Sequence, residues 1–157
     1  MNNPSSKPTL TQEARALVAS SRGGVLCTLM RDGTPYGSLV EFAPLPDGDI
    51  LMFLSRLAEH QRNLERDPRA SILIAPSADE ADALSRPRLT LVGKVEVEED
   101  RDAMAAVYLA HFPGVRGYIG FTDFQFYRLR VEKARYIAGF GRMGWITGRA
   151  FHTEQDE

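Results

Sequence analysis

The sequence has little of several features that mark particular classes of protein. Cys27 is the one cysteine among 157 residues, so no disulfide can form within the chain. The sequence has three lysines and sixteen arginines, and these basic residues do not form a continuous cluster. The net charge is −2. These properties argue against binding to nucleic acid through a clustered positive field. No apolar run reaches the roughly 18 residues that a membrane-spanning helix needs. We therefore expect a cytoplasmic protein with neither nucleic acid nor membrane as a partner.

Several catalytic and metal-binding motifs are also missing. The sequence contains no HExxH, CxxC, GxSxG or phosphate-binding P-loop pattern. Glycines are frequent in residues 114–120 and 139–144, but they do not follow the GxGxxG order between a strand and a helix. A structural metal site and a Rossmann dinucleotide site are therefore not expected.

Alternating apolar residues and turn signals predict a mainly β protein with helices in the connections. Residues 25–30, 36–45 and 50–55 form an expected antiparallel meander, since Asp32-Gly33 and the segment 46–49 favour tight turns. Further strands are expected at residues 69–76, 88–99 and 124–140, and helices at 11–21, 56–66 and 100–112. This order indicates six or more antiparallel strands in a closed or nearly closed barrel with outer helices. We expect a disordered tail at 1–9, one domain at 10–150 and a C-terminal tail at 151–157.

Polar residues gather where the strand at 50–55 passes into the following helix. Ser55 is placed to cap that helix, and His60 and Asn63 lie three residues apart on one face of it. Amides in a first helical turn favour an anion, to which an imidazole can donate a hydrogen bond. The pattern therefore predicts an anion site, although a capped surface helix with a polar outer face would show the same residues.

Other candidates carry weaker signals. Ser38 alternates with Val40 on one face of its strand, next to Gly37, which could let a flat ligand approach the backbone. Arg88 begins a strand, where it is either solvated or part of an anion site. Asp123 is most simply a turn residue.

Together these segments resemble a known family. The succession "GTPYGSLVEFAPLPDGDILMFLSRLAEHQRNLERDPRASILI", followed by "RLTLVGKVE", "FTDFQFYRL" and "ARYIAGFG", resembles the pyridoxamine 5′-phosphate oxidase-like FMN-binding split barrel, in its haem-utilisation branch. The similarity covers about residues 10–145. It implies a six-stranded or larger split β-barrel, and a homodimer with FMN in a groove between the subunits.

The resemblance also assigns residues. Ser38, Leu39, Val40, Leu54 and Ser55 would lie along the cofactor, and His60, Asn63 and Arg88 would occupy its polar binding positions. The basic residues that hold the phosphate in true pyridoxamine phosphate oxidases are absent at Ser38 and His60, so Arg56 or Arg62 would supply charge. The substrate-binding signature of those oxidases is not visible either.

Three functions remain open from the sequence. The first is an FMN-dependent oxidoreductase, for which no catalytic residue can be named. The second is a haem-binding or haem-degrading protein, in which His152 would be the axial ligand and Asp123 from the partner subunit would orient it. The third is a non-catalytic module that binds a ligand for regulation.

Overall fold

The computed structural model describes residues 6–76, 82–139 and 141–153. Its strands are β1 (Gly23–Leu29), β2 (Pro35–Glu41), β3 (Ala43–Pro44), β4 (Ile50–Ser55), β5 (Arg69–Ile74), β6 (Arg88–Val97), β7 (Phe124–Gly139) and β8 (Arg142–Thr147). The α-helices are α1 (Leu10–Ser20), α2 (Glu59–Arg66), α3 (Arg101–His111) and α4 (Gly148–Thr153), with short 3₁₀ turns η1 (Ala83–Ser85) and η2 (Pro113–Gly117). The first five residues of the expected N-terminal tail lie outside the described residues.

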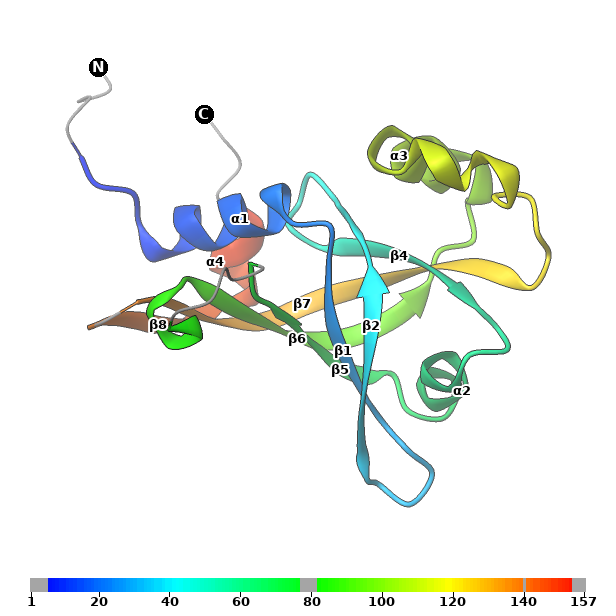
Figure 1. The fold of residues 1–157 in the computed structure, drawn as a ribbon, viewed down its shortest axis with the longest axis horizontal. Coiled ribbons are helices and arrows are strands. Elements are labelled where there is room, and N and C mark those ends of the chain that lie inside the picture. The colour runs from blue at the N-terminus through cyan, green and yellow to red at the C-terminus, as the bar shows by residue number, and fades with distance from the viewer. Residues whose placement is uncertain (1–5, 77–81, 140, 154–157) are drawn as a thin grey trace.

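All eight strands form one curled antiparallel sheet with the helices around it (Figure 1). The strand order is β2-β1-β5-β6-β7-β4-β3, and β8 also pairs with β7. The long strand β7 makes this possible, because it pairs with β6 on one side and with both β4 and β8 on the other. This half-barrel with peripheral helices confirms the expected split-barrel fold class.

The expected three-strand meander is confirmed at both turns, but its second strand, 36–45, is divided into β2 and β3. β1 and β2 form the predicted hairpin, whereas β4 pairs with β3 and with β7 and not with β2. The chain leaves β2 through Phe42, which is fully buried, and enters β3 at the opposite edge of the sheet. Within the described ranges β2 and β4 are neighbours without a hydrogen-bonded ladder. The sheet is therefore split between them, a long-range outcome that local turn signals do not encode.

The apolar run of β4 is explained by burial on both of its faces. Ile50, Met52 and Leu54 face the interior of the curled sheet. Leu51 and Phe53 face a second cluster formed with α3 and η2. A strand covered on both faces reads as a continuous apolar run instead of an alternating one.

The C-terminal residues are packed more tightly than the sequence indicated. Residues 151–157 were expected to form a tail, yet α4 includes residues 151–153, and Phe151 is fully buried in the main core. Gly148 begins this helix directly against the β7 backbone, where a Cβ would lie 2.7 Å from the Val131 carbonyl oxygen. No helix in the described ranges is both long and apolar enough to cross a membrane.

Candidate functional site

A cleft of about 250 Å³ opens at the split in the sheet, between β2 and β4. It is closed from the sides by the start of α2, by α3 and by the segment that leads into β7. Its lining comprises Leu39, Val40, Glu41, Phe53, Leu54, Ser55, Ala58, His60, Tyr108, Tyr118 and Phe124. Five of the residues predicted from the sequence therefore meet here: Leu39, Val40, Leu54, Ser55 and His60.

His60 is joined to a sixth predicted residue. Its Nδ1 lies 3.1 Å from the Ser38 hydroxyl oxygen, which holds the ring across the gap between α2 and β2. Its Nε2 is buried and has no hydrogen-bond partner. Burial lowers the pKa of His60, so the imidazole is neutral at neutral pH. His60, which lines the cleft, thus has a neutral ring with a buried nitrogen whose bonding capacity is unused.

The predicted capping role of Ser55 is wrong. The α2 helix begins at Glu59, and its N-cap is Ala58, which makes no side-chain capping bond. The Ser55 hydroxyl instead accepts a hydrogen bond from the Leu57 amide at 3.1 Å. Serine hydroxyls often stabilise such turns, and this turn delays the start of the helix by three residues. Leu57 lies in this turn and is exposed.

Asn63 is fully buried and bonded within the protein. Its Nδ2 donates to the Thr28 hydroxyl at 3.1 Å, and its Oδ1 accepts from the Arg66 guanidinium at 2.6 Å. Both ends of the amide are therefore engaged, one with β1 and the other within α2. Direct contact between Asn63 and a cofactor stays a prediction.

The remaining predicted residues lie outside the lining. Arg88 donates to the backbone carbonyl of Leu84 at 2.8 Å, and Asp123 accepts a backbone bond from Arg56 at 2.7 Å. The Arg56 side chain is exposed and donates to Gln125, and Arg62 is exposed on α2. No lysine or arginine of the described residues lines the cleft.

Aromatic side chains that the sequence analysis missed form one wall of the cleft. Phe53 stacks within 5.1 Å of Phe124 and within 6.2 Å of Tyr118, measured between ring centroids. Tyr108 packs on Phe53 from α3, and burial raises the pKa of its hydroxyl. No local pattern reveals this wall, because its members are separated by up to 71 positions and meet only in the folded chain.

His152 lies in a different environment. Its Nε2 is 2.7 Å from a carboxylate oxygen of Asp49, and that carboxylate is 1% exposed. The same oxygen accepts the Val131 amide at 2.9 Å, and Arg128 lies 3.8 Å from the other. One ring nitrogen of His152 is therefore bonded to the protein, and its role as axial ligand stays a prediction.

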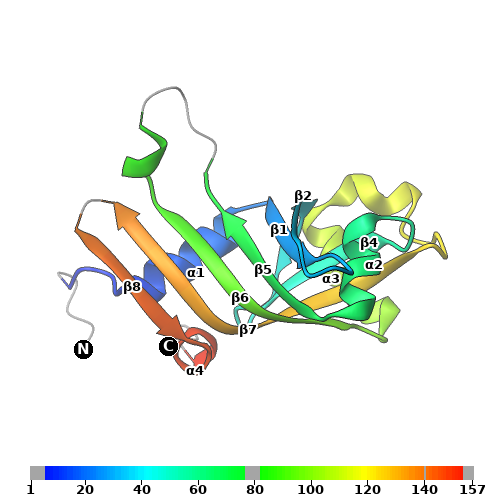
Figure 2. The same cartoon turned by 90° about the horizontal axis from the view of Figure 1, so that it is seen from below.

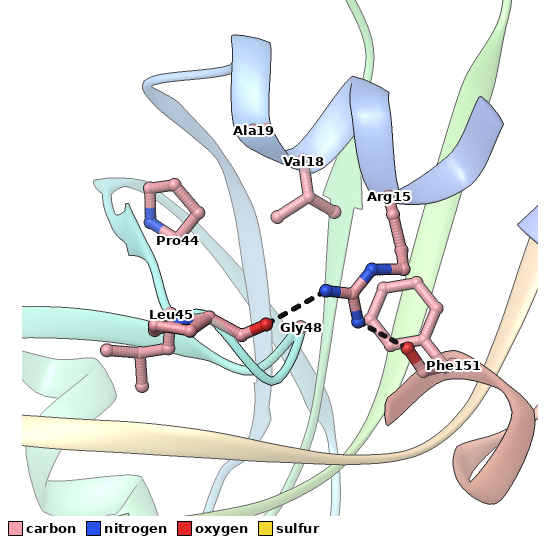
Figure 3. Close-up of a pocket in the computed structure, with 8 residues that line it drawn as sticks. Arg15, Val18, Ala19, Pro44, Leu45, Gly48 and Phe151 are labelled. Carbon is pink, nitrogen blue, oxygen red and sulfur yellow. Dashed lines mark hydrogen bonds between the residues drawn. The ribbon is translucent and has the colours of Figure 1, made fainter. Parts of the chain in front are cut away.

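A second cavity of about 320 Å³ lies beside that pair, between α1, the turn before β4, and α4 (Figure 3). Arg15 extends from α1 across it and donates to the backbone carbonyls of Phe151 at 2.6 Å, Pro46 at 2.9 Å and Asp47 at 3.2 Å. The guanidinium thus fastens three segments together, which is a structural role.

Comparison with known proteins supports the same fold. The family described as pyridoxamine 5′-phosphate oxidase matches residues 10–138. The non-canonical heme oxygenase HOZ of Arabidopsis thaliana chloroplasts is 34% identical over 132 residues, which cover 82% of this chain and 40% of that protein. Heme oxygenase HutZ of Vibrio cholerae is 29% identical over 129 residues, covering 78% of this chain and 73% of HutZ.

A solved structure is similar over nearly the whole chain. A heme-binding protein from Mycobacterium smegmatis superposes with a TM-score of 0.85 at 39% identity, covering 94% of this chain and 61% of that one. This chain therefore spans 40% of the length of the Arabidopsis protein and 61% of the mycobacterial chain, less than two thirds of either. The resemblance to the haem-utilisation branch is confirmed, and the chain belongs to the pyridoxamine 5′-phosphate oxidase family.

Proposed function

We propose that this protein binds haem in the cleft between β2 and β4, as a homodimer. The observation that carries the proposal is the unpartnered Nε2 of His60, buried in a cleft with an aromatic wall. The names of the related proteins point the same way, since HOZ and HutZ are heme oxygenases and the mycobacterial protein binds heme. This reading replaces an FMN oxidoreductase as the preferred function.

The apolar and aromatic lining of the cleft favours a large flat ligand. Leu39 lines the cleft and is 85% exposed, and Phe53, Tyr108, Tyr118 and Phe124 form its aromatic wall. Ligand pockets are lined mainly by apolar and aromatic side chains. A porphyrin would cover Leu39, and each apolar Å² removed from water contributes about 25 cal/mol.

The Ser38–His60 pair prepares the imidazole for that ligand. The Ser38 hydroxyl engages Nδ1, so Nε2 is the ring nitrogen of this cleft residue that is left without a partner. A neutral ring with one nitrogen held by a hydrogen bond is the form in which histidine meets a metal or a polar ligand group. Bound haem would supply an iron atom at which dioxygen can react. The protein would orient the haem, and its aromatic wall would exclude water from one side of the ligand.

FMN is the second candidate. The match to the pyridoxamine 5′-phosphate oxidase family supports it, as does the position of Leu39, Val40, Leu54 and Ser55 along one cleft. The neutral His60 and the carboxylate of Glu41 are a poor setting for a phosphate dianion. We therefore rank FMN below haem, and a cytoplasmic location also stays a prediction.

Titration of the purified protein with haem tests the proposal. We expect a Soret band that saturates in wild type, and a dissociation constant raised at least about tenfold in His60→Ala. The matched control is His111→Ala, because His111 is exposed at the end of α3 and bonds only the Val107 carbonyl. Absence of a Soret band in wild type, or equal affinity in His60→Ala, would refute the proposal. Loss of the band in His152→Ala would confirm the ligand predicted from the sequence.

A further inference from the structure

An arginine outside the cleft contacts the segment that carries part of its aromatic wall. Tyr118 and Phe124 line the cleft and stand at the two ends of residues 118–124, the wall segment, where the chain passes from η2 into β7. Arg101, the first residue of α3, does not line the cleft. Its guanidinium donates to the backbone carbonyls of Phe124 at 2.7 Å, Ile119 at 2.8 Å and Phe121 at 2.9 Å. A single side chain therefore binds the wall segment at three points.

The same guanidinium also contacts aromatic rings of the sheet. Arg101 Cζ lies 5.6 Å from the ring centroid of Phe53 and 6.0 Å from that of Phe126. A guanidinium at about this distance over an aromatic ring is attracted to its π face. Phe53 stacks on Phe126 at 4.5 Å and also contacts the rings of Tyr118 and Phe124. One cation thus joins the wall segment to the rings against which the segment's own aromatic side chains pack.

The middle of the wall segment contributes few side-chain contacts of its own. Residues 120–122 are exposed, and the Phe121 side chain is 53% exposed. At Gly120 an added Cβ would meet no atom within 4 Å. Burial of side chains therefore offsets little of the conformational entropy that is lost when these residues are ordered. The bonds from Arg101 are the stronger constraint on this part of the chain.

A guanidinium is well suited to such an arrangement. It presents five N–H donors in one plane, so its two terminal nitrogens can bind several carbonyl oxygens at once. Backbone carbonyls that are removed from water without a donor cost free energy. None of the ion pairs in the described ranges includes Arg101, so its bonding capacity is directed to these carbonyls and rings. Arg101 therefore stabilises the observed course of the wall segment.

We infer that Arg101 is a positioning residue of the cleft, which holds Tyr118 and Phe124 against Phe53 so that the aromatic wall is formed before a ligand enters. A preformed wall raises affinity, because the wall segment does not have to be ordered at the moment of binding. This inference rests on the proposed function for the identity of the ligand. The order of the wall segment can be measured without a ligand.

Arg15 offers a matched comparison at the other end of the molecule. Its guanidinium also donates to three backbone carbonyls, and its Cζ lies 5.8 Å from the ring centroid of Phe151. Arg15 joins α1 to α4, which lie at one end of the sheet, whereas α3, α2 and β4 lie at the other (Figure 2). Loss of either guanidinium should lower the stability of the fold, but only loss of Arg101 should change the cleft.

Hydrogen exchange of the ligand-free protein tests the positioning role. The amides of Tyr118, Ile119 and Phe121 donate hydrogen bonds and should exchange slowly in wild type. In Arg101→Ala we expect exchange across the wall segment to be at least about tenfold faster, because local opening requires less free energy. In Arg15→Ala, exchange of this segment should match wild type. Equal exchange in wild type and Arg101→Ala would overturn the inference.

Haem titration tests the consequence for binding. The dissociation constant should rise at least about tenfold in Arg101→Ala and less than about twofold in Arg15→Ala. Faster exchange of the wall segment with unchanged haem affinity would overturn the inference, as would an equal loss of affinity in the two variants. An absent Soret band in wild type would refute the proposed function instead, and hydrogen exchange would still decide whether Arg101 orders the wall segment.

Arg101→Lys provides the same test if Arg101→Ala does not fold. It keeps a positive charge, but its single nitrogen cannot occupy the positions of both Nη1 and Nη2, which together reach the three carbonyls. We expect faster exchange of the wall segment and weaker haem binding in this variant too. Wild-type exchange and wild-type affinity in Arg101→Lys would overturn the inference.

Discussion

The two histidine clusters of this protein show how differently the same side chain can be used. At one end of the molecule His152 Nε2 binds the buried carboxylate of Asp49, which also accepts a backbone amide. At the split in the sheet His60 Nδ1 binds a serine hydroxyl, while its Nε2 has no partner. A network with every bond made stabilises a fold, whereas a buried nitrogen without a partner costs stability unless a ligand satisfies it. The difference indicates a structural role for His152 and a binding role for His60.

The largest expected effect is on stability, at the His152 end. Asp49→Ala removes a buried carboxylate and leaves the Val131 amide and the His152 ring without their acceptor. We expect the free energy of unfolding to fall by about 2–3 kcal/mol. Urea unfolding followed by circular dichroism measures it. Glu96→Ala is the control, because its pair with Arg130 is half exposed and should contribute less than about 1 kcal/mol. Equal losses in the two variants would contradict the structural role.

The Asn63→Ala variant tests whether Asn63 on α2 stabilises the fold or contacts the ligand. Asn63→Ala leaves the buried Thr28 hydroxyl without its donor and frees Arg66. The expected loss in the free energy of unfolding is about 2 kcal/mol. If Asn63→Ala retained full stability but lost haem affinity, the amide would be a ligand contact, as predicted from the sequence.

His60→Ala should give the opposite pattern. It removes one hydrogen bond and one unsatisfied nitrogen, so we expect stability to change by less than about 1 kcal/mol. The weakened haem binding described above should therefore occur in a folded protein. Thermal unfolding of the same sample used for titration checks this. A loss of stability as large as that of Asn63→Ala would show that His60 stabilises the fold, and would contradict a binding role.

The smallest expected effect is a dependence of stability on pH. Burial lowers the pKa of His60 in the folded protein below its ordinary value of 6.5. When the pH falls below 6.5, His60 is therefore protonated in the unfolded chain before it is protonated in the folded chain. The stabilising contribution is present above that value and is lost as the pH falls. Urea titrations at several pH values should show a steeper decline between pH 7 and pH 5 in wild type than in His60→Gln. Parallel curves would show that the ring is not desolvated.

Much of the site could be predicted from local sequence. Alternation along β2 placed Val40 and Leu39 on opposite faces, and Val40 is buried whereas Leu39 is exposed. The resemblance carried by the succession of motifs identified five residues that line one cleft. The start of α2 could not be predicted from the same pattern, because a serine hydroxyl can stabilise either a helix start or a turn. The aromatic wall was missed because Phe53, Tyr108 and Tyr118 share no local period.

The sequence by itself determined a mainly β domain, its first hairpin and the residues that are chemically suited to hold a ligand. Only the tertiary structure decided which of them meet. The order of strands is set by long-range pairing along β7, which opens the split beside His60 and buries Phe151 with α4 at the other end. The free energy of a contact depends on burial and on available partners. For that reason one histidine is satisfied by Asp49, whereas the other has a buried nitrogen without a partner.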